Sequence, residues 1–167
     1  YLAHLGREVL LVDLDPQANA TSGAGIEHAK LPHGIYEALL GEKSILDIIK
    51  RTKEPRFRVA PATEALAGAG VELVAMADRE YRLHDILEEA KGEYDYIIVD
   101  SPPSLGLLTI NSLVAADEIL IPVQSEYYAL EGLGQLINSI GLVQANLKPN
   151  LTILGAVITM YDKRNSL

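Results

Sequence analysis

The segment Val9–Asn19 constrains the fold of this chain more than any other. It opens with four consecutive Val and Leu residues, and a run this short and apolar favours a strand buried on both faces of a parallel sheet. Asp13 and Asp15 follow, and Pro16 ends the regular strand. In open α/β sheets, ligands bind beyond the carboxyl ends of the strands. The two acids are therefore either site residues or part of an ordinary turn, and this segment alone leaves both interpretations open.

The segment Tyr94–Asp100 is a second short apolar strand that ends in an acid, and Ser101–Ser104, with two prolines, follows it. An apolar strand ending in Asp is typical of the Walker B motif, whose carboxylate helps to hold a magnesium ion at nucleotide phosphates. Many strands end in Asp, so the pattern is weak by itself. Asp100 is a candidate magnesium residue, and capping of the next loop is the alternative.

Three segments of the chain, residues 12–23, 94–104 and 122–132, resemble in wording, order and spacing the ParA/Soj partition ATPases. These belong to the deviant-Walker group of P-loop proteins, which also includes MinD. The resemblance extends across essentially all 167 residues. It implies an α/β fold, with a mostly parallel sheet and helices on both faces, and an ATPase that uses ATP and Mg²⁺.

The resemblance also implies that part of the domain is absent. The family begins with a strand and a loop of the form Lys-Gly-Gly-x-Gly-Lys-Thr-Thr, and no such loop occurs in this sequence. The family also continues beyond Leu167 with further strands and a helix. We therefore expect residues 1–167 to be one incomplete deviant-Walker ATPase domain. Without the backbone N–H groups and lysines that hold phosphates, we expect this piece alone to bind ATP poorly and to be inactive.

By resemblance, Asp15 is the catalytic residue that orients the attacking water, and capping of the turn at Pro16 is the alternative. Asp100 is expected to hold magnesium through a bound water. Asp13 either supports the magnesium shell or only bonds the neighbouring loop, and the sequence favours neither interpretation.

Four further residues complete the expected nucleotide site. Gln17 and Asn19 are placed to reach phosphate or water, although loop amides are often only turn formers. Pro102 stiffens the second switch loop, because a residue before proline is held extended, and this rigidity would help transmit the presence of the γ-phosphate to a dimer face. Glu126, by resemblance to MinD-like proteins, pairs with a lysine of the absent loop in one nucleotide state. Its alternative role is that of an exposed acid at a helix start.

Composition excludes several other functions. The net charge of −9, from 23 acids and 14 bases, argues against strong nucleic-acid binding by this piece itself. Bases cluster within residues 50–58 and at residues 163–164, where solvated surface is the simpler interpretation. The absence of Cys excludes disulfides and thiolate metal sites, and the four His residues show no metal-binding spacing. The sequence contains no Gly-x-Gly-x-x-Gly motif, so a Rossmann dehydrogenase is set aside.

The expected function is that of a ParA/Soj-like ATPase in chromosome or plasmid segregation. The resemblance implies an ATP-dependent homodimer that binds DNA non-specifically, mostly through regions outside this chain, and hydrolyses ATP on stimulation by a ParB-like adaptor. Such a protein would be cytoplasmic and nucleoid-associated, without a membrane partner. The alternatives are a MinD-like positioning ATPase and a nucleotide-free interaction module that has lost its P-loop. The sequence Asp-Pro-Gln-Ala-Asn at residues 15–19 favours the partition ATPases over the MinD-like proteins.

Hydrophobic patterning predicts alternating strands and helices. Predicted strands are residues 8–13, 57–60, 96–100, 118–122 and 151–160. Predicted helices are residues 34–41, 44–50, 78–91, 107–115 and 129–147, with a small polar loop at 17–25 and an ambiguous stretch at 62–77. The crossover-length connections between strands indicate a parallel sheet.

Overall fold

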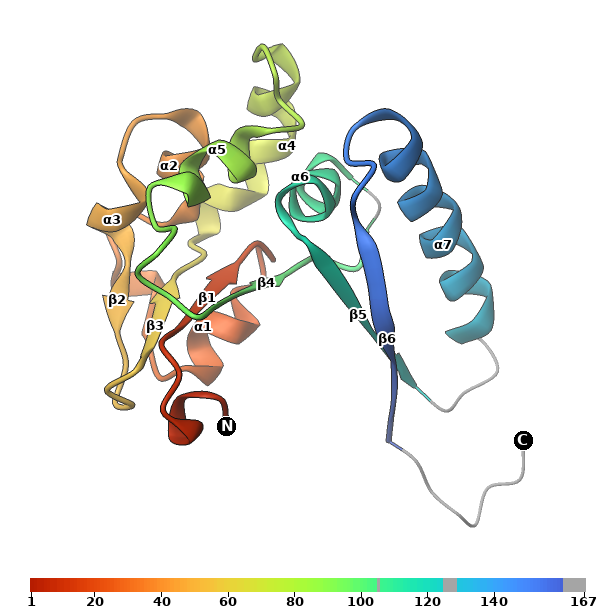
Figure 1. The fold of residues 1–167 in the computed structure, drawn as a ribbon. Coiled ribbons are helices and arrows are strands. Elements are labelled where there is room, and N and C mark those ends of the chain that lie inside the picture. Colours follow the sequence, from red (N-terminus) through yellow and green to blue (C-terminus); the bar gives the residue numbers. More distant parts are fainter. Residues whose placement is uncertain (105, 125–128, 161–167) are drawn as a thin grey trace. The chain divides into compact units, whose positions relative to one another are not determined.

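The computed structural model describes residues 1–104, 106–124 and 129–160 (Figure 1). The chain forms two compact units, Tyr1–Ala115 and Ala116–Leu167. Each unit has parallel strands connected through helices, so the predicted α/β fold with a mostly parallel sheet is confirmed.

A four-stranded sheet organises the first unit, in the order β2-β3-β1-β4. Its strands are β1 (Val9–Asp13), β2 (Lys50–Arg51), β3 (Phe57–Ala60) and β4 (Tyr96–Asp100). The central strand β1 pairs in parallel with both β3 and β4, whereas β2 is antiparallel to β3. The register places Asp13 directly beside Asp100, so the predicted acids share one edge of the sheet.

The helices of the first unit are short. They are α1 (Asn19–Gly23), α2 (Ile35–Leu40), α3 (Ile45–Ile48), α4 (Ala69–Glu72), α5 (Arg82–Glu88) and α6 (Leu107–Ala115), and 3₁₀ turns occur at Ala3–Leu5, His28–Lys30, Glu64–Gly68 and Leu73–Ala75. Local chemistry sets the ends of α2. The Gly34 N–H donates to the Glu37 carboxylate at 2.7 Å, and Gly41 ends the helix at φ 80°, a conformation that glycine adopts without steric cost.

The core of the first unit lies between one face of the sheet and the helices. Leu10 and Val12 are fully buried there, and they belong to one cluster with Leu39 of α2 and Leu83 of α5. Removal of this aliphatic surface from water is the main force that holds the sheet and helices together.

In the described part of the second unit, residues 116–124 and 129–160, there are two parallel strands and one long helix. These are β5 (Glu118–Gln124), β6 (Thr152–Thr159) and α7 (Ala129–Asn146). Ile121, Ile140, Val143 and Leu151 are its buried apolar residues. All three elements lie where the sequence predicts them, with small differences at their ends.

Three other sequence predictions were wrong in detail. Residues 17–25, predicted as a loop, contain α1. Lys50, predicted as the end of a helix, lies in β2, because pairing with β3 takes the chain out of the helix after Ile48. The helix predicted at residues 78–91 covers only Arg82–Glu88, because Asp78 adopts a left-handed conformation, φ 51°, that helical residues do not have.

Candidate carboxylate site at the sheet edge

Asp13 is fully buried at the end of β1, and its carboxylate bonds the loop that follows. Its Oδ1 accepts a hydrogen bond from the Asp15 N–H at 3.1 Å. Its Oδ2 accepts one from the Thr21 N–H at 2.7 Å and another from the Thr21 hydroxyl at 2.6 Å. Asp13 therefore caps the first turn of α1, where unpaired N–H groups favour a negative charge. This geometry favours the loop-bonding interpretation of Asp13.

Asp15 is half-buried and lies two residues beyond the strand. Its Oδ1 accepts from the Gln17 N–H at 2.9 Å, which closes a local turn. Its Oδ2 has no hydrogen-bond partner among the residues that the structure describes. Asp15 thus closes the turn with one oxygen and leaves the second oxygen open to a ligand or a water.

The loop after Asp15 contains a strained residue. Ala18 is buried with φ 53°, a left-handed conformation that costs an L-residue about 1–2 kcal/mol. Gln17 and Asn19 flank it with exposed side chains. Strain of this kind persists where surrounding contacts enforce it, and it is common in ligand-binding loops.

Asp100 is exposed at the end of β4 and is the neighbour of Asp13 in the sheet. Partial burial raises the pKa of Asp100, and the nearby negative charges of Asp13 and Asp15 raise this pKa further. Asp13 and Asp15 are thus close enough to disfavour the negative charge of Asp100. A cation at this edge would relieve that repulsion.

We expect Asp100→Asn to stabilise the nucleotide-free protein at neutral pH, by about 1 kcal/mol or less because the group is partly solvated. A carboxyl group whose pKa is higher in the folded state than in the unfolded state lowers the free energy of unfolding as the pH rises through the folded-state pKa. Below the unfolded-state pKa the group is protonated in both states, so this destabilisation is absent. Thermal unfolding of both proteins at neutral pH and at about pH 3 tests this, because the difference should vanish in acid. Equal stability at neutral pH would contradict the proposed repulsion.

The Pro102 loop is bonded to the helix that follows it. The Thr109 hydroxyl of α6 lies 2.5 Å from the Ser104 carbonyl oxygen and 3.4 Å from that of Pro102. Pro102 is half-buried. Glu126 lies outside the described residues. Of the site residues predicted from the sequence, the structure brings together the three acids Asp13, Asp15 and Asp100 at one edge of the sheet.

Sequence reasoning does not identify two buried polar residues whose side chains link segments of the first unit that are far apart in the sequence. The first is Thr21, whose side chain bonds both Asp13 and Ala62. Asn111 of α6 is the other: its side-chain oxygen accepts from the Leu83 N–H at 3.0 Å, and its Nδ2 donates to the carbonyl oxygens of Arg79 at 2.8 Å and Leu107 at 3.0 Å. The sequence signal for Asn111 is that its side-chain amide occurs within the mostly apolar sequence of α6.

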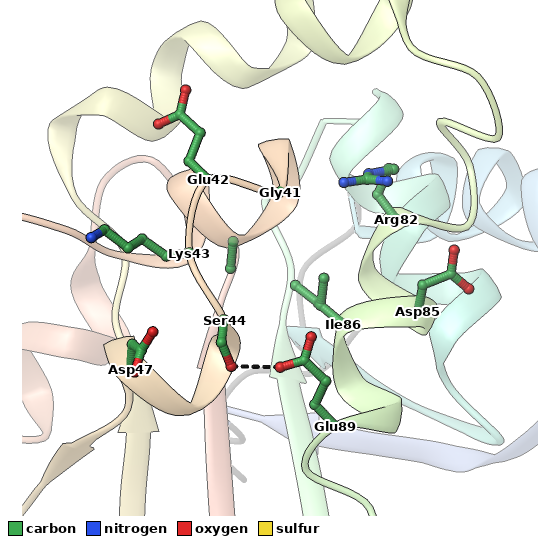
Figure 2. Close-up of a pocket in the computed structure, with 10 residues that line it drawn as sticks. Gly41, Glu42, Lys43, Ser44, Asp47, Arg82, Asp85, Ile86 and Glu89 are labelled. Atoms are coloured by element: carbon green, nitrogen blue, oxygen red, sulfur yellow. Dashed lines mark hydrogen bonds between the residues drawn. The ribbon is translucent and has the colours of Figure 1, made fainter.

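A separate pocket of about 490 Å³ lies between the end of α2, the following turn and α5 (Figure 2). The Ser44 hydroxyl and the Glu89 carboxylate are 2.5 Å apart across it. Its charged residues are Glu42, Lys43, Asp47, Arg82, Asp85 and Glu89. None of the site residues predicted from the sequence lines this pocket.

Within the described ranges, no three His, Cys, Asp or Glu side chains are arranged to hold a metal ion by themselves. The helices described in the same ranges are too short or too polar to cross a membrane.

Comparison with known proteins assigns the family. A sequence model of a family described as "AAA domain" matches residues 1–153 of this chain. The chain belongs to this AAA-domain family.

Curated relatives of this AAA domain carry partition names. The sporulation initiation inhibitor protein Soj of Bacillus subtilis (strain 168) is 55% identical over 166 residues, which cover 99% of this chain and 66% of Soj. The chromosome partitioning protein ParA of Myxococcus xanthus (strain DK1622) is 52% identical, over 99% of this chain and 59% of ParA. The resemblance to ParA/Soj proteins is thereby confirmed, and the chain spans less than two thirds of each relative's length.

A solved structure shares the fold of this chain. It is a cobyrinic acid a,c-diamide synthase from Mycobacterium smegmatis with a bound ATP analogue and magnesium. Its TM-score is 0.94 at 43% identity, over 98% of this chain and 67% of the synthase chain.

Proposed function

We propose that this chain is part of an ATP-dependent partition ATPase of the ParA/Soj kind. The intact protein would bind MgATP, dimerise, bind DNA without sequence preference and hydrolyse ATP on stimulation by a ParB-like adaptor. The observation that carries the proposal is the cluster of Asp13, Asp15 and Asp100 at one sheet edge, in a chain whose relatives at 52–55% identity are Soj and ParA. We place the intact protein in the cytoplasm, on the nucleoid.

The residues present fit magnesium, and they supply part of a nucleotide site. Carboxylate oxygens suit a hard divalent cation, and Asp100 is exposed beside two further acids. The 167 residues contain no Gly-rich loop that would hold the phosphates. We propose that residues 1–167 form an incomplete deviant-Walker domain whose phosphate-holding loop is supplied by the intact protein.

When bound, magnesium neutralises charge that develops on the phosphates. Asp100 would accept hydrogen bonds from water molecules on the ion. Asp15 would accept one from the attacking water through Oδ2, the oxygen left open by the turn. Asp13, already bonded at three points, would hold this loop in place.

Gln17, Asn19, Pro102 and Glu126 remain proposed nucleotide-site residues. Gln17 and Asn19 flank Ala18 in the loop that follows Asp15, and both side chains are exposed. Pro102 lies in the loop that joins Asp100 to α6, so a change at the ion could move this helix.

Hydrolysis by the intact protein tests the proposal. We expect ATP turnover that requires Mg²⁺, rises when DNA and a ParB-like adaptor are added, and falls strongly in Asp100→Asn. Asp47→Asn, a substitution of an exposed acid in the separate pocket, is the matched control and should behave as wild type. Magnesium-independent turnover, or equal activity of the two variants and wild type, would refute the assigned site. Absence of any hydrolysis would favour the nucleotide-free interaction module.

A further inference from the structure

Thr21 links helix α1 to the end of β1 and to the segment just beyond β3. Its hydroxyl donates to Asp13 Oδ2 at 2.6 Å and accepts from the Ala62 N–H, just beyond β3, at 3.0 Å. Its own N–H also donates to Asp13 Oδ2, at 2.7 Å. All three residues are buried, so these bonds are shielded from competition with water.

We infer that Thr21 is a positioning residue for ATP hydrolysis, acting through Asp13 on the loop that presents Asp15. This inference rests on the proposed function. The two donors of Thr21 hold Oδ2 of Asp13, and this orientation directs Oδ1 to the Asp15 N–H at 3.1 Å. The hydroxyl of Thr21 therefore controls where the backbone of Asp15 lies.

The hydrogen bonds that lead from Ala62 through Thr21 and Asp13 to Asp15 begin next to the sheet. Ala62 follows β3, which pairs with β1, so the Ala62 N–H is fixed relative to the strand that carries Asp13. The carboxylate of Asp15 is otherwise held only by the local turn at Gln17, within the described residues. Without the hydroxyl, the Ala62 N–H would be unpaired and Asp13 Oδ2 would keep a single donor.

This arrangement predicts an effect on turnover that is separate from nucleotide binding. A displacement of about 1 Å at a catalytic group is enough to lower a rate about 100-fold. Thr21 itself is buried and bonded to protein groups, so its loss should change ATP affinity much less than it changes kcat.

The test compares four variants of the intact protein. Thr21→Val keeps the shape of the side chain and removes its hydroxyl group. Thr21→Ala removes both the hydroxyl and the methyl group, whereas Thr21→Ser keeps the hydroxyl group. Thr63→Val is the matched control, because Thr63 is only 7% exposed and its hydroxyl has no partner among the described residues. For each variant, kcat and the Kd for ATP are measured well below Tm, alongside Asp15→Ala.

We expect Thr21→Val to lower kcat at least about tenfold with the Kd for ATP within about twofold of wild type, since positioning acts on the transition state. Thr21→Ser should restore most of kcat, and Thr63→Val should match wild type.

The inference is overturned if Thr21→Val keeps wild-type kcat while Asp15→Ala is inactive, and the proposed function then stands. An equal loss in Thr21→Ser, or a loss in Thr63→Val as large as that in Thr21→Val, also overturns it. If neither Thr21→Val nor Thr21→Ala folds, Thr21 maintains the fold and the inference fails. A wild-type protein without ATPase activity removes the proposed function and this inference together.

Discussion

Replacing Asp15 by Ala in the intact protein is expected to lower the rate of ATP hydrolysis about 100-fold or more, the range typical of a lost catalytic acid or base. ATP binding and dimerisation should stay close to wild type, because Asp15 acts on the attacking water rather than on the nucleotide. Single-turnover hydrolysis and an equilibrium ATP titration separate the two effects.

Asp15→Asn distinguishes catalysis from turn formation. The amide oxygen of Asn can still accept the bond from the Gln17 N–H, which the Asp15 carboxylate accepts at 2.9 Å, so the turn should persist. We expect Asp15→Asn to be nearly as inactive as Asp15→Ala. Wild-type turnover in Asp15→Asn would show that the residue serves only the turn.

Asn111→Ala is expected to lower the free energy of unfolding by about 3 kcal/mol, because buried groups that lose their partner keep their desolvation penalty. The groups left unpaired are the Leu83 N–H and the Arg79 carbonyl oxygen. These two groups and Asn111 join α6 to the start of α5. Urea denaturation of the intact protein measures the change.

Asn146 of α7 offers a matched control. Its Nδ2 donates to the carbonyl oxygen of Leu142, four residues earlier, at 2.8 Å, as Asn111 does to Leu107, but Asn146 is exposed. Asn146→Ala should cost about 0.5 kcal/mol or less, as surface substitutions usually do. If Asn111→Ala lowers the free energy of unfolding as little as Asn146→Ala does, the hydrogen bonds between α6 and the start of α5 contribute little to stability.

The sequence predicts those parts of the fold that depend on local pattern. The apolar runs that end at Asp13 and Asp100 are strands, and α6 has the predicted bounds. The rule that ligands bind beyond the carboxyl ends of parallel strands directs attention to this edge. The pairing of β1 with β4, which places Asp13 beside Asp100, comes from the structure.

The remaining features depend on partners that are distant in sequence. Helix α1 is capped by Asp13, eight residues before Thr21, rather than by an adjacent side chain. Strand β2 contains two residues and exists through its pairing with β3. The bonds from Thr21 to Ala62 and from Asn111 to Leu83 span 41 and 28 residues, so no local pattern indicates them.

We propose that the edge formed by Asp13, Asp15 and Asp100 is the MgATP site of the intact protein. The most direct test is the structure of the intact protein with a non-hydrolysable ATP analogue and Mg²⁺. We predict the ion within one water molecule of Asp100, and the terminal phosphate facing the open oxygen of Asp15. A nucleotide bound instead in the pocket between α2 and α5, or anywhere else away from the three carboxylates, would contradict the account.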